Sequence, residues 1–322
     1  MSKLKSFLKL IRFKNLLIIT LIQVAIKFSL INLYFSNSAL SDFDFIIYLL
    51  AIITIVAGGY IINDIYDVEI DKINNPETRI IERKIEKKTA MKAYYILNFT
   101  GIISGFYVSY QVNKFWLVCI FIFFIFSLWK YSKNYKTTFL IGNLQVSFLT
   151  ALSIISIALF DLVPVGVKIE DGSTIIFYII LFYAGFSFMT TLIREIIKDM
   201  EDIEGDKKKM ANTLAINYGI EKTKKITTFL ILAPILGIGY FQYFQYSVLN
   251  STFSVELSYW GVDLIAVLYT SLVQVLLMIL IIKITTSNTK ENFHSSSRLC
   301  KVIMLIGILS IPLFSFLHLN QC

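Results

Sequence analysis

The sequence predicts an all-α integral membrane protein, a bundle of about nine transmembrane helices with a polar cap on the cytoplasmic side. Composition is the first observation behind this prediction. The 322 residues are 56% hydrophobic and only 16% charged, whereas a typical soluble domain is about 45–50% apolar and about 25% charged. Secondly, apolar stretches recur along the whole chain, most of them close to the ~20 residues that a helix needs to cross a bilayer. We therefore expect residues 1–322 to form a single transmembrane domain.

Each apolar stretch is expected to be a helix. Backbone polar groups in lipid must be satisfied within the segment, and the alternating pattern of a membrane β-barrel is absent from the sequence. The first stretch follows a basic start without a small-residue cleavage site, so we expect a retained helix and not a signal peptide. The predicted spans cover residues 15–35, 44–63, 93–110, 114–129, 139–160, 174–193, 226–246, 261–283 and 301–318.

Charge placement predicts how the chain crosses the membrane. With nine spans, the side that holds the N-terminus carries all of the 30 Lys and Arg residues except Lys27, Lys114 and Lys168. Because basic loops remain in the cytoplasm, we expect a protein of the cell (inner) membrane with a cytoplasmic N-terminus and Cys322 outside. Topology and anionic lipid headgroups explain the net charge of +8, so no nucleic acid is expected as a partner.

Two loops on the cytoplasmic side carry acidic as well as basic side chains. In the first, Asn63, Asp67 and Asp71 are spaced i, i+4, i+8 as the second span ends, with Asp64 beside them. A continuing helix would line these side chains along one face. The two histidines and three cysteines of the chain show no metal-ligand spacing, so we expect no His-based or Cys-based metal site.

The second acidic loop begins as the sixth span ends. Its acidic residues recur at i, i+4, i+7, i+11, which is again one helical stripe. These residues are Glu195, Asp199, Asp202 and Asp206. Both stripes follow helices that run in the same direction, so we expect them to converge at the cytoplasmic mouth of one cavity.

Closely spaced carboxylates repel one another and need a compensating charge. Mg²⁺ prefers oxygen ligands and commonly takes one or two carboxylates together with substrate phosphates. Two facing stripes can therefore hold two or more Mg²⁺ around a diphosphate. A single acidic stripe is more often a solvated helix end, but two stripes on one side of an apolar bundle favour a metal–diphosphate site.

The spacing and order of these motifs resemble those of the UbiA superfamily of intramembrane prenyltransferases. The run Asn63-Asp64-x-x-Asp67-x-x-x-Asp71 and the later Asp-rich loop carry most of the resemblance. The start Leu10-Ile11-Arg12-Phe13-Lys14-Asn15 is also similar, as is the segment from Tyr131 to Asn143. The stretch from Arg194 to Asp206 is closest to the branch that makes digeranylgeranylglyceryl phosphate, an ether lipid.

The resemblance implies a Mg²⁺-dependent enzyme. Nine helices would surround a central cavity open to lipid, and the cap would hold the polar site. An isoprenyl group would pass from an isoprenyl diphosphate donor to a lipophilic acceptor without an organic cofactor, with membrane lipids as the other partners. The implied catalytic pair is Asp67 and Asp199, and the implied metal ligands are Asn63, Asp64, Asp67, Asp71, Asp199, Asp202 and Asp206.

The ether-lipid branch implies that the acceptor is a prenylated glycerol phosphate. The run Lys207-Lys208-Lys209 offers a place for its phosphate, although such a run is also typical of a solvated turn that faces headgroups. An aromatic acceptor of quinone biosynthesis, of the 4-hydroxybenzoate or naphthoate type, is the alternative. After Arg79 the chain continues Ile80-Ile81-Glu82-Arg83, where the family usually has Pro-x-Pro and a small-residue turn, so this loop is expected to fold differently over the site.

Polar residues near the stripes complete the predicted diphosphate site. Arg is the better fork for phosphate oxygens, whereas any Lys on this side also helps to orient the helices. Tyr60 and Tyr66 could face a carbocation, because aromatic faces attract cations, or could anchor the membrane interface. The candidate substrate-binding residues are Arg79, Lys133, Lys136, Glu195, Lys198, Tyr66 and Asn143.

Acidic stripes in a helical bundle could also belong to a divalent-cation transporter. Such proteins place their ion ligands near the bilayer midplane, often within helical repeats. Here the carboxylates lie at one membrane face, the middles of the helices are almost uncharged, and no convincing repeat is visible. The sequence therefore favours diphosphate binding over ion transport.

Overall fold

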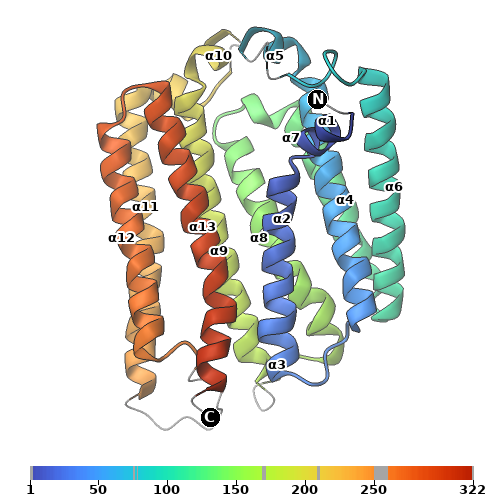
Figure 1. Cartoon of the computed structure of the whole chain (residues 1–322), viewed down its shortest axis with the longest axis vertical. Coiled ribbons are helices and arrows are strands. Elements are labelled where there is room, and N and C mark those ends of the chain that lie inside the picture. The colour runs from blue at the N-terminus through green and yellow to red at the C-terminus, as the bar shows by residue number, and fades with distance from the viewer. Residues whose placement is uncertain are drawn as a thin grey trace.

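The computed structural model describes residues 3–74, 77, 79–168, 172–208, 211–249 and 260–320. In this part of the chain all regular elements are helices, and the only strand-like feature is one isolated backbone bridge between Ile81 and Ile85. The long helices run side by side in an elongated bundle, with α1 at one end and the last turn of α13 at the other (Figure 1). The all-α prediction is confirmed.

The first crossing combines α2 (Phe13–Ile26), a π-helical turn (Lys27–Ile31) and α3 (Asn32–Tyr34), and the short α1 (Lys3–Leu10) precedes it. The other long helices are α4 (Asp42–Tyr66), α6 (Lys87–Gln111), α7 (Val118–Lys133), α8 (Ile141–Asp161), α9 (Ser173–Glu201), α11 (Leu214–Leu249), α12 (Leu264–Thr286) and α13 (Lys290–Leu319). Two short helices, α5 (Val68–Asn74) and α10 (Ile203–Lys208), follow α4 and α9.

Eight helical segments of the described residues are long and apolar enough to cross a membrane. The remaining predicted span lies in α6, which has 25 residues like α4 but begins with Lys87, Lys88 and Lys92 and is therefore less apolar. The first predicted span falls on the helical run from α2 to α3, and each of the others falls on one long helix, so the prediction of about nine membrane helices agrees with the structure. The predicted ranges are too short at α11 and α13, because apolar patterning does not register a helix that continues into polar surroundings.

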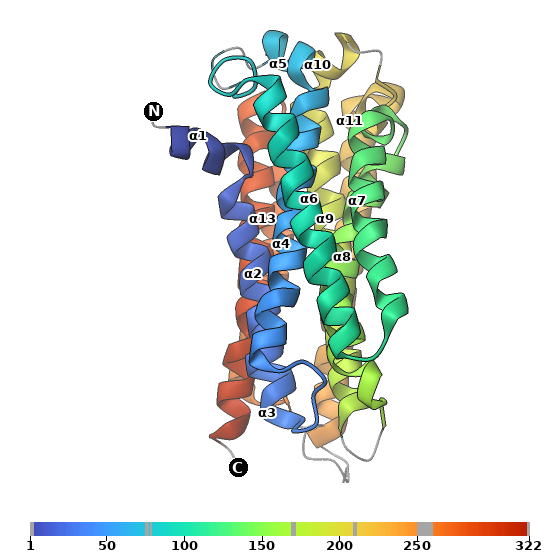
Figure 2. The same cartoon turned by 90° about the vertical axis from the view of Figure 1, so that its right-hand side faces the viewer.

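The helices form two groups. On one side α4 packs against α6 and α7, and on the other α9 packs against α11 and α13, while α8 lies against α9 (Figures 1 and 2). Close approach depends locally on glycine. A Cβ added at Gly105 of α6 would stand only 2.3 Å from the ring of Phe121 of α7, so these two helices touch near the hairpin that joins them.

A buried ion pair ties three segments together in the half of the bundle away from α5 and α10. Lys27 Nζ lies 2.7 Å from Asp161 Oδ2, and both side chains are fully buried. Leu40 completes the network, because its carbonyl accepts from Lys27 at 2.7 Å and its N–H donates to Asp161 at 2.8 Å. Buried charges persist when they are paired and hydrogen-bonded in this way. Lys27, an exception in the charge pattern of the loops, is thus half of an internal pair.

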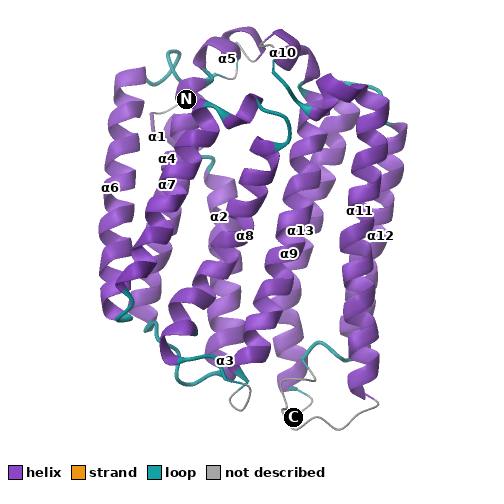
Figure 3. Cartoon of the chain, turned by 180° about the vertical axis from the view of Figure 1, so that it is seen from behind, coloured by secondary structure: helices purple, strands orange, loops and turns teal. Residues whose placement is uncertain are grey.

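The spacing of the acidic residues predicts that each stripe lies on one continuous helix. The structure differs, because each stripe spans two helices. α4 ends just before Asp67 and α9 ends just before Asp202, and the chain then turns into α5 and α10. Backbone hydrogen bonds from Asp71 N to Asp67 O (2.9 Å) and from Asp206 N to Asp202 O (3.0 Å) preserve the helical spacing across each turn. α5 and α10 contact one another at this end of the bundle (Figures 1 and 3).

Candidate active site

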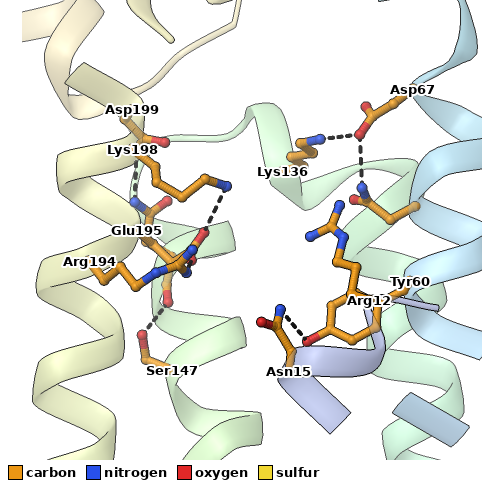
Figure 4. A network of polar contacts seen from close by, with 12 residues as sticks. Arg12, Asn15, Tyr60, Asp67, Lys136, Ser147, Arg194, Glu195, Lys198 and Asp199 are labelled. Atoms are coloured by element: carbon orange, nitrogen blue, oxygen red, sulfur yellow. Dashed lines mark hydrogen bonds and ion pairs between the residues drawn. The ribbon is translucent and has the colours of Figure 1, made fainter. Parts of the chain in front are cut away.

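One half of the site is built around Asp67, where α4 ends. Its carboxylate accepts a hydrogen bond from Asn63 Nδ2 at 2.9 Å and forms an ion pair with Lys136 (Figure 4). Asn63 and Asp67 are both buried, with exposures of 9% and 8%. Lys136 comes from the 3₁₀ turn Tyr135–Thr137 between α7 and α8. A residue predicted to bind substrate therefore lies directly against a predicted metal ligand.

The N-terminal segment adds a cation that sequence reasoning did not assign to the site. The chain bends at Arg12, between α1 and α2, in the left-handed conformation (φ 49°, ψ 52°). Arg12 Nη2 lies 3.2 Å from Asp64 Oδ1, and the guanidinium carbon lies 4.9 Å from the centre of the Tyr60 ring. Asn15 Nδ2 donates to Tyr60 Oη at 3.3 Å, so this corner is fixed from both α2 and α4.

Arg12 remains a cation in this environment. Partial loss of water around Arg12, whose side chain is still 42% exposed, would by itself lower the pKa of Arg12, but the neighbouring Asp64 carboxylate and Tyr60 outweigh that effect and raise it. The sequence did contain a signal, because Arg12 and Asn15 belong to the segment that resembles the family.

The other half of the site lies at the end of α9. Asp199 Oδ2 accepts a hydrogen bond from Asn143 Nδ2 at 2.8 Å. Ser147 Oγ donates in turn to the Asn143 backbone carbonyl at 2.6 Å. Asn143 and Ser147 are buried in the first turns of α8. Asn143, predicted to bind substrate, therefore orients Asp199.

Glu195 lies one turn before Asp199 and is held by cations of its own helix. Arg194 Nη1 lies 2.5 Å from Glu195 Oε1, and Lys198 Nζ lies 3.9 Å from Glu195 Oε2 (Figure 4). Arg194 Nε is buried and has no hydrogen-bond partner among the described residues. A carboxylate repels an anionic substrate, so Glu195 is better suited to orient Arg194 and Lys198 than to touch phosphate itself.

The two halves face one another across the bundle (Figure 4). Arg12 and Lys136, which belong to the first half, both act electrostatically on Glu195 in the second. Tyr131 of α7 lies within electrostatic range of both Asp67 and Asp199. The clusters around Asp67 and Asp199 therefore behave as one charged site, in which cations alternate with carboxylates.

Three predicted residues lie away from these contacts. Lys133 Nζ stands 4.9 Å from the centre of the Trp129 ring. Tyr66 is 42% exposed and lines an outward-facing groove. Arg79 lies in the loop between α5 and α6, where its Nη1 is 3.9 Å from Glu82 Oε2 and its Nε is buried without a hydrogen-bond partner among the described residues.

The later members of the stripes lie at the junctions with the short helices. Asp71 belongs to α5, Asp206 belongs to α10, and Asp202 stands between α9 and α10. Lys207 and Lys208 are exposed on α10. Lys209, the third residue of the predicted phosphate-binding run, lies outside the described residues.

The oxygen donors of the site suit Mg²⁺ only if a substrate supplies further ligands. The described residues hold no group of three Asp, Glu, His or Cys side chains close enough to bind a metal by themselves. Mg²⁺ does not need such a cage, because it commonly takes one or two carboxylates plus substrate phosphates. The Asn63–Asp67 pair and Asp199 offer amide and carboxylate oxygens, and the Lys136 cation already stands against Asp67. These residues fit a cation that protein and diphosphate share.

The fold and the site together define a membrane-embedded helical protein in which two charged clusters face one another, an arrangement that suits an anionic, phosphate-bearing group. The sequence model of the UbiA prenyltransferase family matches residues 25–293. The chain belongs to this family, and the predicted resemblance is confirmed.

Curated relatives extend over most of the chain. The digeranylgeranylglyceryl phosphate synthase of Methanosphaera stadtmanae is 33% identical over 270 residues, which cover 84% of this chain and 87% of that protein. The synthase of the same name from Methanococcus aeolicus is 32% identical over 320 residues, which cover 98% of this chain and 99% of that one. The protein is accordingly an enzyme of the prenyltransferase class, and these relatives do not support the ion-transporter alternative.

Solved structures agree with this assignment. One described as digeranylgeranylglyceryl phosphate synthase in membranes has a TM-score of 0.62 and 25% identity, with 98% of this chain and 99% of that chain covered. A UbiA homologue from Archaeoglobus fulgidus, bound to GPP and Mg²⁺, has a TM-score of 0.53 and 13% identity, with 95% and 99% covered. The second likeness concerns the fold alone. Together with the long apolar helices, the family identifies an integral membrane protein.

Proposed function

We propose that the protein uses Mg²⁺ to transfer an isoprenyl group from an isoprenyl diphosphate to the free hydroxyl of a prenylated glycerol phosphate. The observation that carries this proposal is the pair of clusters around Asp67 and Asp199, which face one another at one end of the bundle (Figure 4). Alternating cations and carboxylates suit a metal-bound diphosphate. The name shared by the relatives that are 33% and 32% identical favours the ether-lipid acceptor.

The metal would be held from both sides of the site. When bound, Mg²⁺ neutralises charge on the diphosphate and makes it a better leaving group. The Archaeoglobus fulgidus homologue, which binds GPP and Mg²⁺, supports this assignment. Asp64 is turned toward Arg12, which leaves Asn63, Asp67, Asp71, Asp199, Asp202 and Asp206 as the proposed ligands.

The cations of the chain would bind the remaining diphosphate oxygens. Arg12 offers a planar fork, and Lys136 would exchange its contact with Asp67 for a phosphate oxygen. As transfer proceeds, the bond between donor C1 and the diphosphate oxygen breaks, the acceptor oxygen bonds to C1, and the hydroxyl loses its proton. Asn63, Asp67 and Asn143 are buried, which limits the water that could intercept the allylic carbon.

We also propose that the site faces the cytoplasm of the cell (inner) membrane. α1, α5 and α10 lie at one end of the bundle and the last turn of α13 lies at the other (Figures 1 and 2). Nearly all Lys and Arg residues belong to the first end, and the positive-inside rule assigns that end to the cytoplasm. The last turn of α13 would then lie outside, and Cys322, which was predicted to be outside, lies beyond the described residues.

The deciding experiment is a transfer assay with the purified full chain in lipid nanodiscs. Isoprenyl diphosphates of several lengths, Mg²⁺ and three acceptors would be supplied: a prenylated glycerol phosphate, 4-hydroxybenzoate and a naphthoate. Mass spectrometry would identify the product. We expect an ether-linked product from the glycerol phosphate, and none when Mg²⁺ is chelated.

The outcomes separate the two parts of the proposal. Transfer to an aromatic acceptor, with none to the glycerol phosphate, would reject the acceptor but keep the prenyltransferase chemistry. No transfer to any acceptor, from a protein that binds the donor and is folded, would reject the proposed reaction.

A further inference from the structure

An outward-facing groove runs between α4, α6 and α7 on the side of the bundle away from α9. It encloses about 380 Å³. Ile62 and Tyr66 of α4 line it together with residues of α6 and α7, and every lining residue is Ile, Met or an aromatic residue. None of the lining side chains carries a charge.

The groove exists because two helices diverge. α6 and α7 meet at Gly105 and Phe121, near the hairpin that joins them. The lining residues of α6 and α7 include Tyr94 and Trp129, which lie closer to the opposite, site-side ends of these helices. α4, which packs against both helices, closes the back of the opening. The opening lies on the outer face of the bundle. In a membrane, lipid therefore fills it.

The length and polarity of the groove follow those of one lipid leaflet. From Lys133, just beyond the polar end, to Ile122, at the apolar end, the rise along α7 is about 16 Å at 1.5 Å per residue. That is close to half of the ~30 Å hydrocarbon core of a bilayer. Phe126 and Ile125 line the middle of this path. The groove therefore has the length of a chain that begins at the headgroup level and ends near the midplane.

Hydrogen-bond donors gather at the polar end. Among the described residues, no partner is found for the hydroxyls of Tyr66, Tyr94 and Tyr95 or for the indole N–H of Trp129. The Tyr94 and Tyr95 rings lie 5.4 Å apart, centre to centre. Tyr and Trp are enriched at the membrane–water interface because one part of each side chain is apolar and the other is polar. Four donors around one groove suit the oxygens of a headgroup.

Positive charge flanks the same end. Lys133 Nζ lies 4.9 Å from the centre of the Trp129 ring, and Lys133 is exposed. Lys92, also exposed, follows the lining residue Met91 on α6. Lysines stand at the rim and no acidic residue lines the groove. This end of the groove is therefore complementary to an anion.

We propose that this groove binds one molecule of an anionic phospholipid from the leaflet on the site side. One hydrocarbon chain lies along the α6–α7 opening, and the headgroup phosphate accepts from Tyr94, Tyr95 and Trp129 beside Lys133. The lipid site is separate from the reaction site, because Tyr66 faces the groove while the next residue, Asp67, is buried against Asn63 and Lys136. The proposal does not depend on which acceptor the enzyme uses.

Fluorescence quenching by brominated lipids tests the site, since Trp129 lines the groove. The full chain would be reconstituted in phosphatidylcholine vesicles that contain a small fraction of either phosphatidylglycerol or phosphatidylcholine brominated on its chains. The chain has three Trp residues. The Trp116→Phe variant keeps Trp129 as the reporter of the groove. The Trp129→Phe variant keeps Trp116, which is 55% exposed and precedes α7 at its other end. Trp260 is buried and common to both variants.

We expect brominated phosphatidylglycerol to quench the Trp116→Phe protein more strongly than brominated phosphatidylcholine at the same fraction. One favourable lysine corresponds to roughly fivefold local enrichment of an anionic lipid. Adding Lys133→Gln, or Tyr94→Phe with Tyr95→Phe, should remove most of the difference. The Trp129→Phe protein should show equal quenching by the two lipids.

Three results would overturn the proposal. The first is equal quenching of the Trp116→Phe protein by both lipids. The second is the same preference in the Trp129→Phe protein, which would mean general attraction of anionic lipid to the bundle. The third is a preference that survives both the lysine and the tyrosine substitutions. Thermal unfolding of each variant checks that the proteins remain folded.

Discussion

Asp67 is a buried carboxylate and Asp199 is a partly exposed one, and different partners hold them in place. Asp67 is paired with Lys136 and Asn63, whereas Asp199 accepts from the neutral Asn143. Replacing either by Ala removes a proposed metal ligand and little packing. We expect turnover to fall by about 10²–10³, the loss that follows from removing one group that stabilises transition-state charge. Initial rates at saturating donor and Mg²⁺ would measure this.

Asp42→Asn is the matched control, because Asp42 is an exposed acid at the first turn of α4, the opposite end from Asp67. Its activity should stay near that of the unaltered protein. Near-normal turnover in Asp67→Ala or Asp199→Ala would remove that residue from the proposed site.

Arg12 is the site residue that sequence reasoning missed, and its contacts give it a testable role. It pairs with Asp64 at 3.2 Å and lies over Tyr60. A hydrogen bond to a charged group is worth about 1.5–3 kcal/mol. Arg12→Gln should therefore raise the donor KM by roughly ten- to a hundredfold, with a smaller effect on the acceptor KM. Lys14→Gln, at an exposed neighbouring position, is the control, and equal KM values for the two variants would contradict the role.

At the scale of elements, the sequence predicted where helices run better than where they turn. Apolar patterning located every span, and the spacing of the acids located both stripes. The spacing of the acids did not show that α4 stops before Asp67 and α9 before Asp202, because helical spacing continues through each turn. Nor could it pair Lys27 with Asp161 or Arg12 with Asp64, since these contacts depend on packing between segments far apart in the chain.

The Lys27–Asp161 pair joins the π-helical turn that follows α2 to the end of α8, and removing one partner should loosen both segments. A buried charge left alone costs about 3–5 kcal/mol, whereas replacing both partners by apolar residues of similar size is often neutral. Lys27→Met should therefore lower the thermal unfolding temperature in detergent clearly more than the double variant Lys27→Met with Asp161→Leu. A double variant that is less stable than the single one would show that the charges themselves are not the cause.

The short helix α10 offers a test of the acceptor. Lys207 and Lys208 are exposed on it, and α10 contacts α5 at the end of the bundle that holds the site. If these side chains bind the acceptor phosphate, replacing Lys207, Lys208 and Lys209 by Gln should raise the acceptor KM more than the donor KM. Lys222→Gln on α11, exposed at the same end of the bundle, controls for lost surface charge. An equal rise in both KM values would argue against a phosphate site on α10.

At the scale of the whole molecule, the clustering of basic residues at one end of the bundle should decide which end faces the cytoplasm. Nearly every Lys and Arg residue belongs to the end of the bundle with α1, α5 and α10, and basic loops are retained in the cytoplasm. Cysteine labelling in intact cells tests this in a background without Cys119, Cys300 and Cys322. A membrane-impermeant maleimide should label Asn113→Cys, in the α6–α7 hairpin, and should label Lys14→Cys only after the membrane is permeabilised. The reverse pattern would turn the site to the outside, where the donor diphosphate would have to be supplied from beyond the cell.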